Sequence, residues 1–290
     1  MSSAAVWGRL RDFGELVKFS HTIFLFPFAL AALVLAHAET PLTMGAAFWI
    51  VLALVAARSA AMIMNRIADQ RYDALNPRTA GRPLVTGRVS ATQAWLWLVV
   101  ACALLALAAG MLNPLCLALS PVALAWVLGY SFSKRFTALC HLWLGAATAL
   151  APLGAWLAVT GRWDWGAVAL ALACAGWVAG FDVIYACQDI DFDRGLGLKS
   201  LPACTSLARG LGYSRLLHAL ALAGFLAVGW RFGLGEVYFG GVAVIALILA
   251  CEQWLVARRL ANVPLAFFTL NGVVSVLYFA TLGLDRWLAA

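Results

Sequence analysis

The chain has 290 residues, of which 64% are hydrophobic and 11% are charged, and its mean hydropathy is +0.91. A water-soluble globular protein cannot cover its surface with such a composition, so that class is excluded. The formal net charge of +7 does not require a nucleic acid, because anionic lipid headgroups and a phosphate-bearing substrate account for it equally well. The sequence indicates an integral membrane protein, with no nucleic-acid partner and no obligate protein partner evident.

Runs of about 18 to 24 apolar residues recur along the chain, and each is long enough for an α-helix to cross a hydrocarbon core of roughly 30 Å. Membrane β-barrels alternate in polarity, so these runs predict helices. The first run is too long for the apolar region of a signal peptide, and we expect it to be retained. We predict one all-α membrane domain over residues 1–290, with about nine transmembrane helices at 19–37, 43–64, 92–111, 114–132, 138–160, 165–186, 213–231, 236–256 and 265–284.

Two connections between the predicted helices are long, at 65–91 and about 187–212, and most of the polar residues of interest lie in or beside them. Basic residues indicate orientation, because positive charge accumulates in short cytoplasmic loops. Of the 20 Lys and Arg residues, only Arg162, Arg231 and Arg286 fall on the side opposite to these connections, and Arg58 lies inside a helix. The sequence therefore predicts a cytoplasmic N-terminus.

Acidic residues are scarce, yet six of the thirteen lie in two short stretches at the predicted cytoplasmic ends of the second and sixth helices. The first stretch reads NRIADQRYD, where Asn65, Asp69 and Asp73 are spaced by four and so share one helix face. Three oxygen ligands on one face predict a cation between them. Solvated helix ends are the alternative, but two such motifs on one predicted side favour a metal site.

The second stretch reads DVIYACQDIDFD. Asp182, Asp189 and Asp193 lie at i, i+7 and i+11, within about 20° of one line on a continuous helix of 3.6 residues per turn. Asp191 then points to the opposite side, and we expect it to be solvated. Carboxylate and amide oxygens suit hard cations, and Mg²⁺ commonly takes one or two carboxylates together with phosphate oxygens. The two motifs predict a Mg²⁺ and diphosphate site, for which the candidate phosphate-binding bases are Arg66, Arg78, Arg82, Lys134 and Lys199.

The residues around both motifs resemble the UbiA superfamily of intramembrane prenyltransferases. The pattern Asn65-x3-Asp69-x3-Asp73, followed by Arg82-Pro83-Leu84 and Gly87, is similar to its first signature. The pattern Asp182-x2-Tyr185-Ala186-x2-Asp189-x3-Asp193, followed by Gly197-x-Lys199-Ser200, resembles its second signature in the 4-hydroxybenzoate polyprenyltransferase branch. The likeness extends through Tyr130, Lys134 to Thr137 and Pro152 to Trp156, and it departs at Leu201-Pro202-Ala203.

The resemblance implies a helical bundle around a central cavity, capped on the cytoplasmic side by the two long connections, in a bacterial inner membrane. It implies transfer of a polyprenyl group from an allylic polyprenyl diphosphate to a ring carbon of 4-hydroxybenzoate in ubiquinone synthesis. Asp69 and Asp189 would be catalytic, together with Tyr185, for which core packing is the alternative. By matching position, Lys134 and Arg82 would contact phosphate. Two Mg²⁺ ions would be held by Asn65, Asp69, Asp73, Asp182, Asp189 and Asp193.

Two arginines are candidates for the carboxylate of the aromatic acceptor. Arg58 lies seven residues before Asn65 on the same face and two turns deeper, where an unpaired charge is costly. It is expected to bind diphosphate or the acceptor, with an ion pair to a motif aspartate as the alternative. Arg135 is the other candidate, although a Lys-Arg pair at a helix end is equally a topology signal.

Two other functions remain open on the sequence. The first is the same reaction on a dihydroxynaphthoate in menaquinone synthesis, which the departure at Leu201-Pro202-Ala203 favours. The second is a secondary transporter of an anionic solute, which predicts paired helix breaks at the bilayer midplane. Pro27, Pro121 and Pro152 show no paired arrangement, so the enzyme is favoured.

The remaining polar residues are expected to be structural. The seven cysteines show no CxxC or Cys/His pairing, so neither a disulfide framework nor a zinc site is predicted. Glu252 is expected to extend toward the interface or to pair with Arg258 or Arg259. The histidines are not spaced as ligands and are expected in the core or at the interface: His21, His37, His141 and His218.

Overall fold

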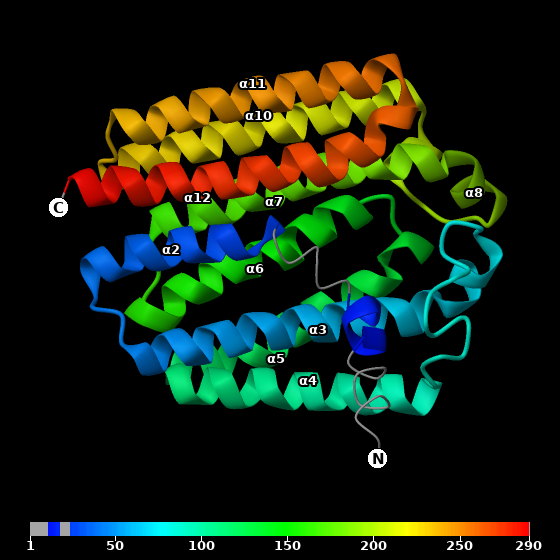
Figure 1. Ribbon diagram of the computed structural model, residues 1–290, viewed down its shortest axis with the longest axis horizontal. Helices are drawn as coiled ribbons and strands as arrows, with labels where there is room; N and C mark the ends of the chain where they lie inside the picture. Colours follow the sequence, from blue (N-terminus) through cyan, green and yellow to red (C-terminus); the bar gives the residue numbers. More distant parts are fainter. Residues whose placement is uncertain (1–10, 18–23, 290) are drawn as a thin grey trace. The chain divides into compact units, whose positions relative to one another are not determined.

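The computed structural model describes residues 11–17 and 24–289, and every regular element in these residues is a helix (Figure 1). The predicted all-α class is confirmed. Eight helical segments are long and apolar enough to cross a membrane. They contain α3 (Met44–Leu75), α4 (Ala91–Leu112), α5 (Pro114–Gly129), α6 (Cys140–Thr160), α7 (Trp165–Ala186), α10 (Leu207–Phe232), α11 (Glu236–Arg258) and α12 (Asn271–Leu288).

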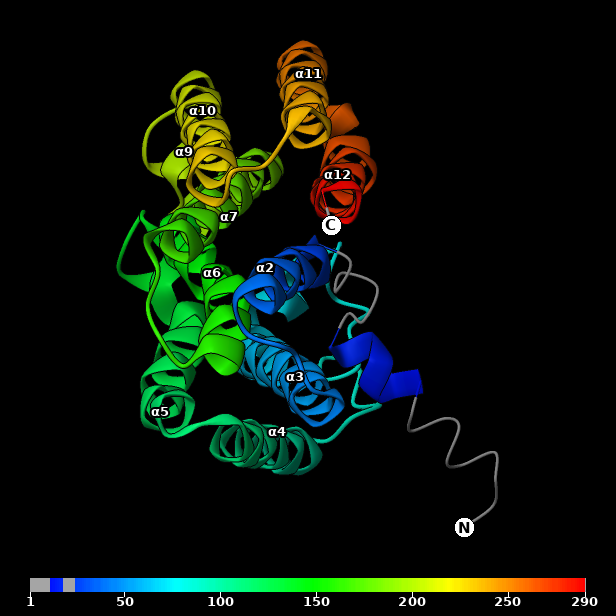
Figure 2. The same ribbon diagram turned by 90° about the vertical axis from the view of Figure 1, so that its left-hand side faces the viewer.

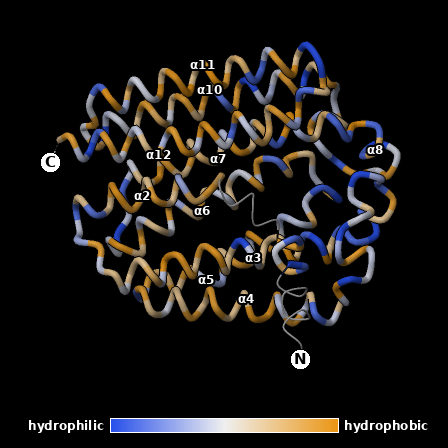
Figure 3. The backbone as a smooth tube through the Cα atoms, viewed as in Figure 1, coloured by the Kyte–Doolittle hydropathy of each residue, from blue (hydrophilic) through white to orange (hydrophobic). Residues whose placement is uncertain are grey.

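The first predicted span, 19–37, is the one that the structure does not reproduce at full length. Its described part holds α2 (Phe26–Glu39), an apolar helix of 14 residues, and residues 19–23 lie outside the described ranges. The count of nine spans is therefore not confirmed. The long helices carry large apolar side chains at their surfaces, for example Leu247 at 71% exposure, which a lipid environment accommodates. The chain is a multi-pass membrane protein, and Figure 3 shows hydrophilic residues in α8 (Ile190–Gly195) beyond the apolar length of the preceding helix.

The chain forms two compact units. The first unit comprises Met1–Thr22 and Ala47–Phe132, and the second comprises Ile23–Ala46 and Ser133–Ala290. The first acidic motif lies in the first unit and the second acidic motif lies in the second unit. The central cavity that the resemblance implies stays a prediction, as does the single domain over the whole chain.

The core of the first unit joins the N-terminal segment to α3, α4 and the connection between them. Leu16 and Ile63 are fully buried, and Leu84 and Val89 from the connection pack in the same cluster. Arg88 donates to Glu15 and Asp12, and these hydrogen bonds, chiefly with Glu15, raise the pKa of its guanidinium. The connection is thus held against the unit's core, and it is shorter than predicted because α3 continues to Leu75.

The core of the second unit depends on close contact between helices. Figures 1 and 2 show α7 beside α10 and α11 beside α12. Aromatic rings fill the interior near α2, where the Phe28 ring lies 5.0 Å from that of Trp177 and 4.9 Å from that of Tyr278. Helices α6 and α7 approach so closely at Gly145 that an added Cβ would lie 2.3 Å from the carbonyl oxygen of Ala175. Only glycine fits there.

Substitution of Gly145 by alanine is expected to lower the free energy of unfolding by about 1–3 kcal/mol, because the backbone oxygen of Ala175 cannot move aside as a flexible side chain would. Gly154→Ala in the same helix is the matched control, since a Cβ there meets nothing within 4 Å. The thermal midpoint in detergent should fall for Gly145→Ala and stay level or rise for Gly154→Ala. Equal midpoints for the two variants would contradict this account of the α6–α7 contact.

A buried polar network contradicts the expectation for Glu252. Its side chain is fully buried and accepts a hydrogen bond of 2.8 Å from Asn271, whose oxygen accepts one of 2.8 Å from the indole of Trp177. The expected pairing with Arg258 or Arg259 was wrong, because Glu252 points into the unit while Arg258 lies over the Trp254 ring, 4.0 Å from its centroid. Asn271 follows a π-helix, η5 (Leu265–Leu270), and also donates to the carbonyl of Ala266.

Candidate functional site

The first motif lies on the last three turns of α3, which continues past the predicted end at residue 64 to Leu75, so that the three motif residues are helical as their spacing predicted. Asn65 donates to Asp69 Oδ2 at 2.8 Å, and Arg66 Nη1 donates to Asn65 Oδ1 at 3.0 Å. The spacing by four therefore does bring the amide and the carboxylate together on one face. Arg66 is 5% exposed, so its charge is held next to these oxygens rather than in solvent.

Asp73, the third residue of the first motif, contacts Arg82. The Nη1 atom of Arg82 lies 2.5 Å from Asp73 Oδ2, and the aspartate side chain is only 9% exposed. The turn after α3 makes this contact possible: Thr79 Oγ1 donates to the carbonyl of Asp73, and the Arg82 amide donates to the carbonyl of Thr79. The tight turn returns Arg82 to the end of the helix that carries the motif.

Arg58 lies two turns before Asn65 in the same helix. Its Nε atom is buried and has no hydrogen-bond partner in the described part of the chain. The alternative that we considered, an ion pair with a motif aspartate, is not formed among residues 11–17 and 24–289. A buried guanidinium donor without a partner is costly, so Arg58 is suited to receive an anionic group from a ligand.

The second motif is not on the continuous helix that we predicted. Helix α7 ends at Ala186, a 3-10 turn η3 covers Cys187–Asp189, and α8 covers Ile190–Gly195. The 3-10 turn changes the rotation per residue, so the predicted continuous helix was wrong, and the alignment of Asp182, Asp189 and Asp193 no longer follows from a spacing of 3.6 residues per turn. Asp193 is 2% exposed, whereas Asp191 is exposed to solvent as expected.

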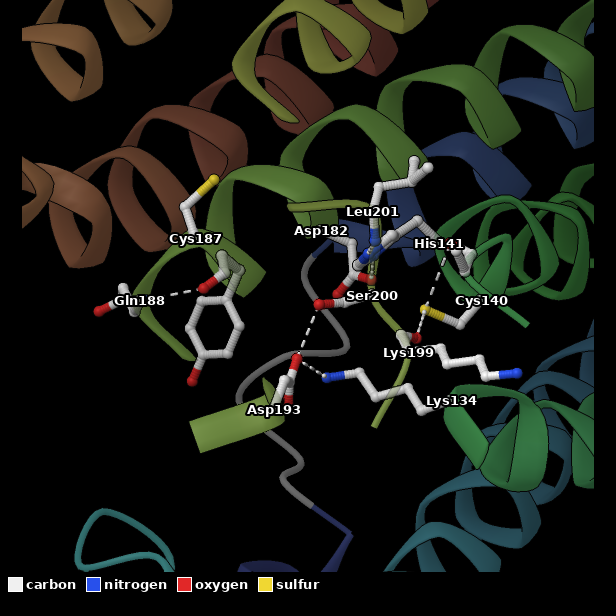
Figure 4. A network of polar contacts seen from close by, with 12 residues as sticks. Lys134, Cys140, His141, Asp182, Cys187, Gln188, Asp193, Lys199, Ser200 and Leu201 are labelled. Atoms are coloured by element: carbon white, nitrogen blue, oxygen red, sulfur yellow. Dashed lines mark hydrogen bonds and ion pairs between the residues drawn. The ribbon is translucent and has the colours of Figure 1, made fainter. Parts of the chain in front are cut away.

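Two of the aspartates of the second motif contact side chains of the same unit (Figure 4). Asp193 Oδ2 accepts a hydrogen bond of 2.8 Å from the hydroxyl of Ser200 and lies 3.7 Å from Lys134 Nζ. Asp182 Oδ2 lies 2.6 Å from Nδ1 of His141. The predicted phosphate-binding Lys134 thus lies beside the motif, at the end of the 3-10 turn η2 (Tyr130–Arg135).

The segment after α8 crosses the start of α6 and is fixed there. The amide of Lys199 donates to the carbonyl of Lys134 at 2.6 Å, and Cys140 Sγ lies 3.5 Å from the carbonyl of Lys199. The Lys199 ammonium donates to the carbonyl of Phe136 at 3.3 Å, and its side chain is exposed. The structure therefore places Lys199 within reach of Lys134, while a role in phosphate binding stays a prediction.

Other predicted residues lie nearby in the second unit. Tyr185 is partly buried, with its ring 4.5 Å from that of Phe267, so it does pack against the core. Arg135 is exposed. His141 and His218 are core residues as expected, and His21 lies outside the described residues. The contact of His141 with Asp182 was not predicted, because the two residues are 41 positions apart and share no motif.

Both motifs offer oxygen donors of the kind that a hard cation requires. Among the described residues there is no group of three or more His, Cys, Asp or Glu side chains arranged to hold a metal ion by themselves. Mg²⁺ rarely uses such a protein cage and instead combines one or two carboxylates with water and phosphate oxygens. Carboxylates with bases beside them therefore fit a Mg²⁺ ion that arrives together with a diphosphate. All seven cysteines are free thiols.

The fold and the two acidic motifs define a class, the helical membrane proteins that carry aspartate-rich motifs at helix ends. The chain belongs to the UbiA prenyltransferase family, whose sequence model matches residues 25–280. It is 34% identical over 235 residues to a 4-hydroxybenzoate octaprenyltransferase of Alkalilimnicola ehrlichii, covering 81% of this chain and 80% of the relative. It is 36% identical over 208 residues to the protein of that name in Azotobacter vinelandii, covering 70% and 68%.

Solved structures share the fold. A UbiA homolog from Aeropyrum pernix K1 in its apo form superimposes with a TM-score of 0.83 at 37% identity, covering 91% of this chain and 98% of the other. A UbiA homolog from Archaeoglobus fulgidus, bound to DMAPP and Mg²⁺, gives a TM-score of 0.72 at 20% identity, covering 95% and 99%. The second similarity is one of fold alone.

Proposed function

We propose that the protein transfers a polyprenyl group from an allylic polyprenyl diphosphate to a ring carbon of 4-hydroxybenzoate, in ubiquinone biosynthesis, with Mg²⁺ as cofactor. The observation that carries the proposal is the presence of two acidic motifs, each with a base in contact: Arg82 beside Asp73, and Lys134 beside Asp193. Curated relatives named 4-hydroxybenzoate octaprenyltransferase support the choice of acceptor. The biased distribution of Lys and Arg supports a cytoplasmic N-terminus, and the similarity to bacterial relatives supports an inner membrane.

The chain's own side chains would bind and orient the diphosphate. Arg66 and Arg82 in the first unit, and Lys134 and Lys199 in the second, supply cationic donors to phosphate oxygens. Bound Mg²⁺ would neutralise charge on the departing diphosphate. Two such ions would be held by the residues of the two motifs, Asn65, Asp69, Asp73, Asp182, Asp189 and Asp193.

The reaction breaks the bond between the allylic carbon and the diphosphate oxygen and forms a bond between that carbon and the ring. A proton then leaves the ring carbon and aromaticity returns. Arg58 would anchor the acceptor carboxylate, since a guanidinium recognises a carboxylate through paired hydrogen bonds, and the exposed Arg135 is the second candidate. The ring of Tyr185, next to the second motif, would stabilise positive charge at the allylic carbon.

A dihydroxynaphthoate is the second candidate acceptor. The departure at Leu201-Pro202-Ala203 forms a short helix, α9 (Leu201–Cys204), directly after the Lys199-Ser200 pair of the second signature. This helix follows the two residues that contact Asp193 and Lys134, so a departure here would alter the part of the site that binds the acceptor. A dihydroxynaphthoate is the acceptor that such a change would favour.

Purified protein in detergent is expected to join geranyl diphosphate to 4-hydroxybenzoate when Mg²⁺ is present, as detected by mass spectrometry. Excess EDTA should abolish the product and added Mg²⁺ should restore it, because the diphosphate leaves slowly without its counter-ion. Full activity in EDTA would contradict the metal dependence. Product from the dihydroxynaphthoate alone would move the protein to menaquinone synthesis, and product from neither acceptor would contradict the proposed reaction.

A further inference from the structure

The side chain of His141, on the first turn of α6, connects two segments of the second unit that carry the second motif and its continuation. It is completely buried, with Nδ1 2.6 Å from Asp182 Oδ2 on α7. On the other side of the ring, the backbone amide of Leu201 donates to Nε2 at 3.3 Å. Figure 4 shows His141 between Asp182 and Leu201.

These two contacts define which nitrogen of the imidazole ring carries the proton. Nε2 must carry a lone pair to accept from the Leu201 amide, so the proton is on Nδ1 and is donated to Asp182. The buried His141 ring cannot rotate freely, so its hydrogen bond holds the Asp182 carboxylate in one orientation. This is the arrangement by which a residue outside the first layer of ligands fixes a ligating carboxylate.

The position of Leu201 explains why the histidine has a second partner. Leu201 is the first residue of α9, and the first amides of a helix have no partner within it. Ser200 precedes the helix but does not cap it, because its hydroxyl donates to Asp193 instead. His141 Nε2 accepts from the Leu201 amide, which has no partner within α9, while Arg194 Nε donates to the carbonyl of Ala203 at 2.9 Å.

We propose that His141 is a positioning residue that orients Asp182 for Mg²⁺ and diphosphate, and that the amide of Leu201 fixes the tautomer in which it does so. The inference rests on the proposed function, because it takes Asp182 as a ligand. The short α9 helix, where the sequence departs from the second signature, would thus help to fix the orientation of Asp182, the first aspartate of that signature.

The test compares His141→Asn with His141→Leu. The two introduced side chains have nearly the same size and shape, but only asparagine carries a hydrogen-bond donor. The amide nitrogen of asparagine occupies about the place of Nδ1 and can still donate to Asp182. For His141→Leu, the Mg²⁺ concentration that gives half-maximal prenyl transfer should rise about 10- to 100-fold. For His141→Asn it should stay within about threefold of the unmodified protein. A second readout is the rise in thermal midpoint when Mg²⁺ and geranyl diphosphate are added without acceptor, which should be lost only in His141→Leu.

His218→Asn is the matched control, since His218 is also buried in the second unit but contacts Gln253, 3.2 Å away, rather than a motif aspartate. It should leave the Mg²⁺ requirement unchanged. An unchanged Mg²⁺ requirement and midpoint rise in His141→Leu would overturn the proposal. If His141→Leu does not fold, a tenfold higher Mg²⁺ requirement in His141→Asn overturns it. Absence of product from the unmodified protein would count against the proposed function alone, because the midpoint rise still tests the positioning role.

Discussion

Replacement of Asp69 by alanine is expected to reduce turnover by at least about 10²–10³-fold, the loss typical of removing one group that stabilises charge in the transition state. Asp69 accepts a hydrogen bond from Asn65 at 2.8 Å on the last turns of α3, and its removal deprives the first motif of a carboxylate. The fold should survive, since the motif lies at a helix end and contributes little to packing. Product formation and the thermal midpoint, measured on the same preparation, check both parts.

Asp189→Ala should behave in the same way, because Asp189 is its counterpart in the second motif. The control is Asp191→Ala, in which an exposed aspartate two residues away is removed without loss of a proposed ligand. Its turnover should remain within about twofold to threefold of the unmodified protein, as is usual for surface substitutions. Full activity in Asp69→Ala or Asp189→Ala would remove the metal-dependent mechanism.

Arg58→Leu is expected to raise the KM for 4-hydroxybenzoate at least about 30-fold, equivalent to ~2 kcal/mol, with little change in the KM for geranyl diphosphate. The reason is that the buried Nε atom of Arg58 has no protein partner in the described residues and so is available to the acceptor carboxylate. Leucine fills similar space in α3 without a charge. Steady-state kinetics with each substrate varied in turn gives the two constants.

Phenol, which lacks the carboxylate, provides the control for this assignment. The unmodified protein should prefer 4-hydroxybenzoate to phenol, and Arg58→Leu should lose most of that preference, because only the carboxylate distinguishes the two acceptors. Arg135→Leu serves as the matched variant, since Arg135 is the other candidate and is exposed. Loss of the preference in Arg135→Leu, with the preference retained in Arg58→Leu, would assign the carboxylate to Arg135 instead.

The fold was largely predictable because hydrophobic length alone determines whether a helix can cross a membrane. The predicted ends were less accurate where polar residues continue a helix beyond its apolar part. Helix α3 extends to Leu75 through the charged motif, and α10 begins at Leu207, six residues before the predicted start at 213. Hydropathy gives no signal at such positions, whereas helix propensity and local hydrogen bonds decide them.

The site was predictable where spacing within one helix determines proximity, as for Asn65 and Asp69. It was not predictable where the helix is interrupted, because the 3-10 turn at Cys187–Asp189 has no sequence signature that we recognised. Contacts between distant segments were also missed. The pairing of His141 with Asp182 and of Glu252 with Asn271 depends on which helix faces are adjacent, and no local pattern encodes that.

The π-helix at Leu265–Leu270 has a consequence for the length of the chain at this point. A π-helical turn accommodates about one residue more than an α-helical turn, so deletion of one residue there can be absorbed by a return to α-helical geometry, and α12 keeps the face that it presents to its neighbours. Deletion of one residue inside α12 before Tyr278 would instead rotate the rest of that helix by about 100°, which would turn Tyr278 away from Tyr238, whose hydroxyl it meets at 3.1 Å, and Asp285 away from the amide of Gly235. Single-residue deletions should therefore be tolerated better at Leu265–Leu270 than within α12.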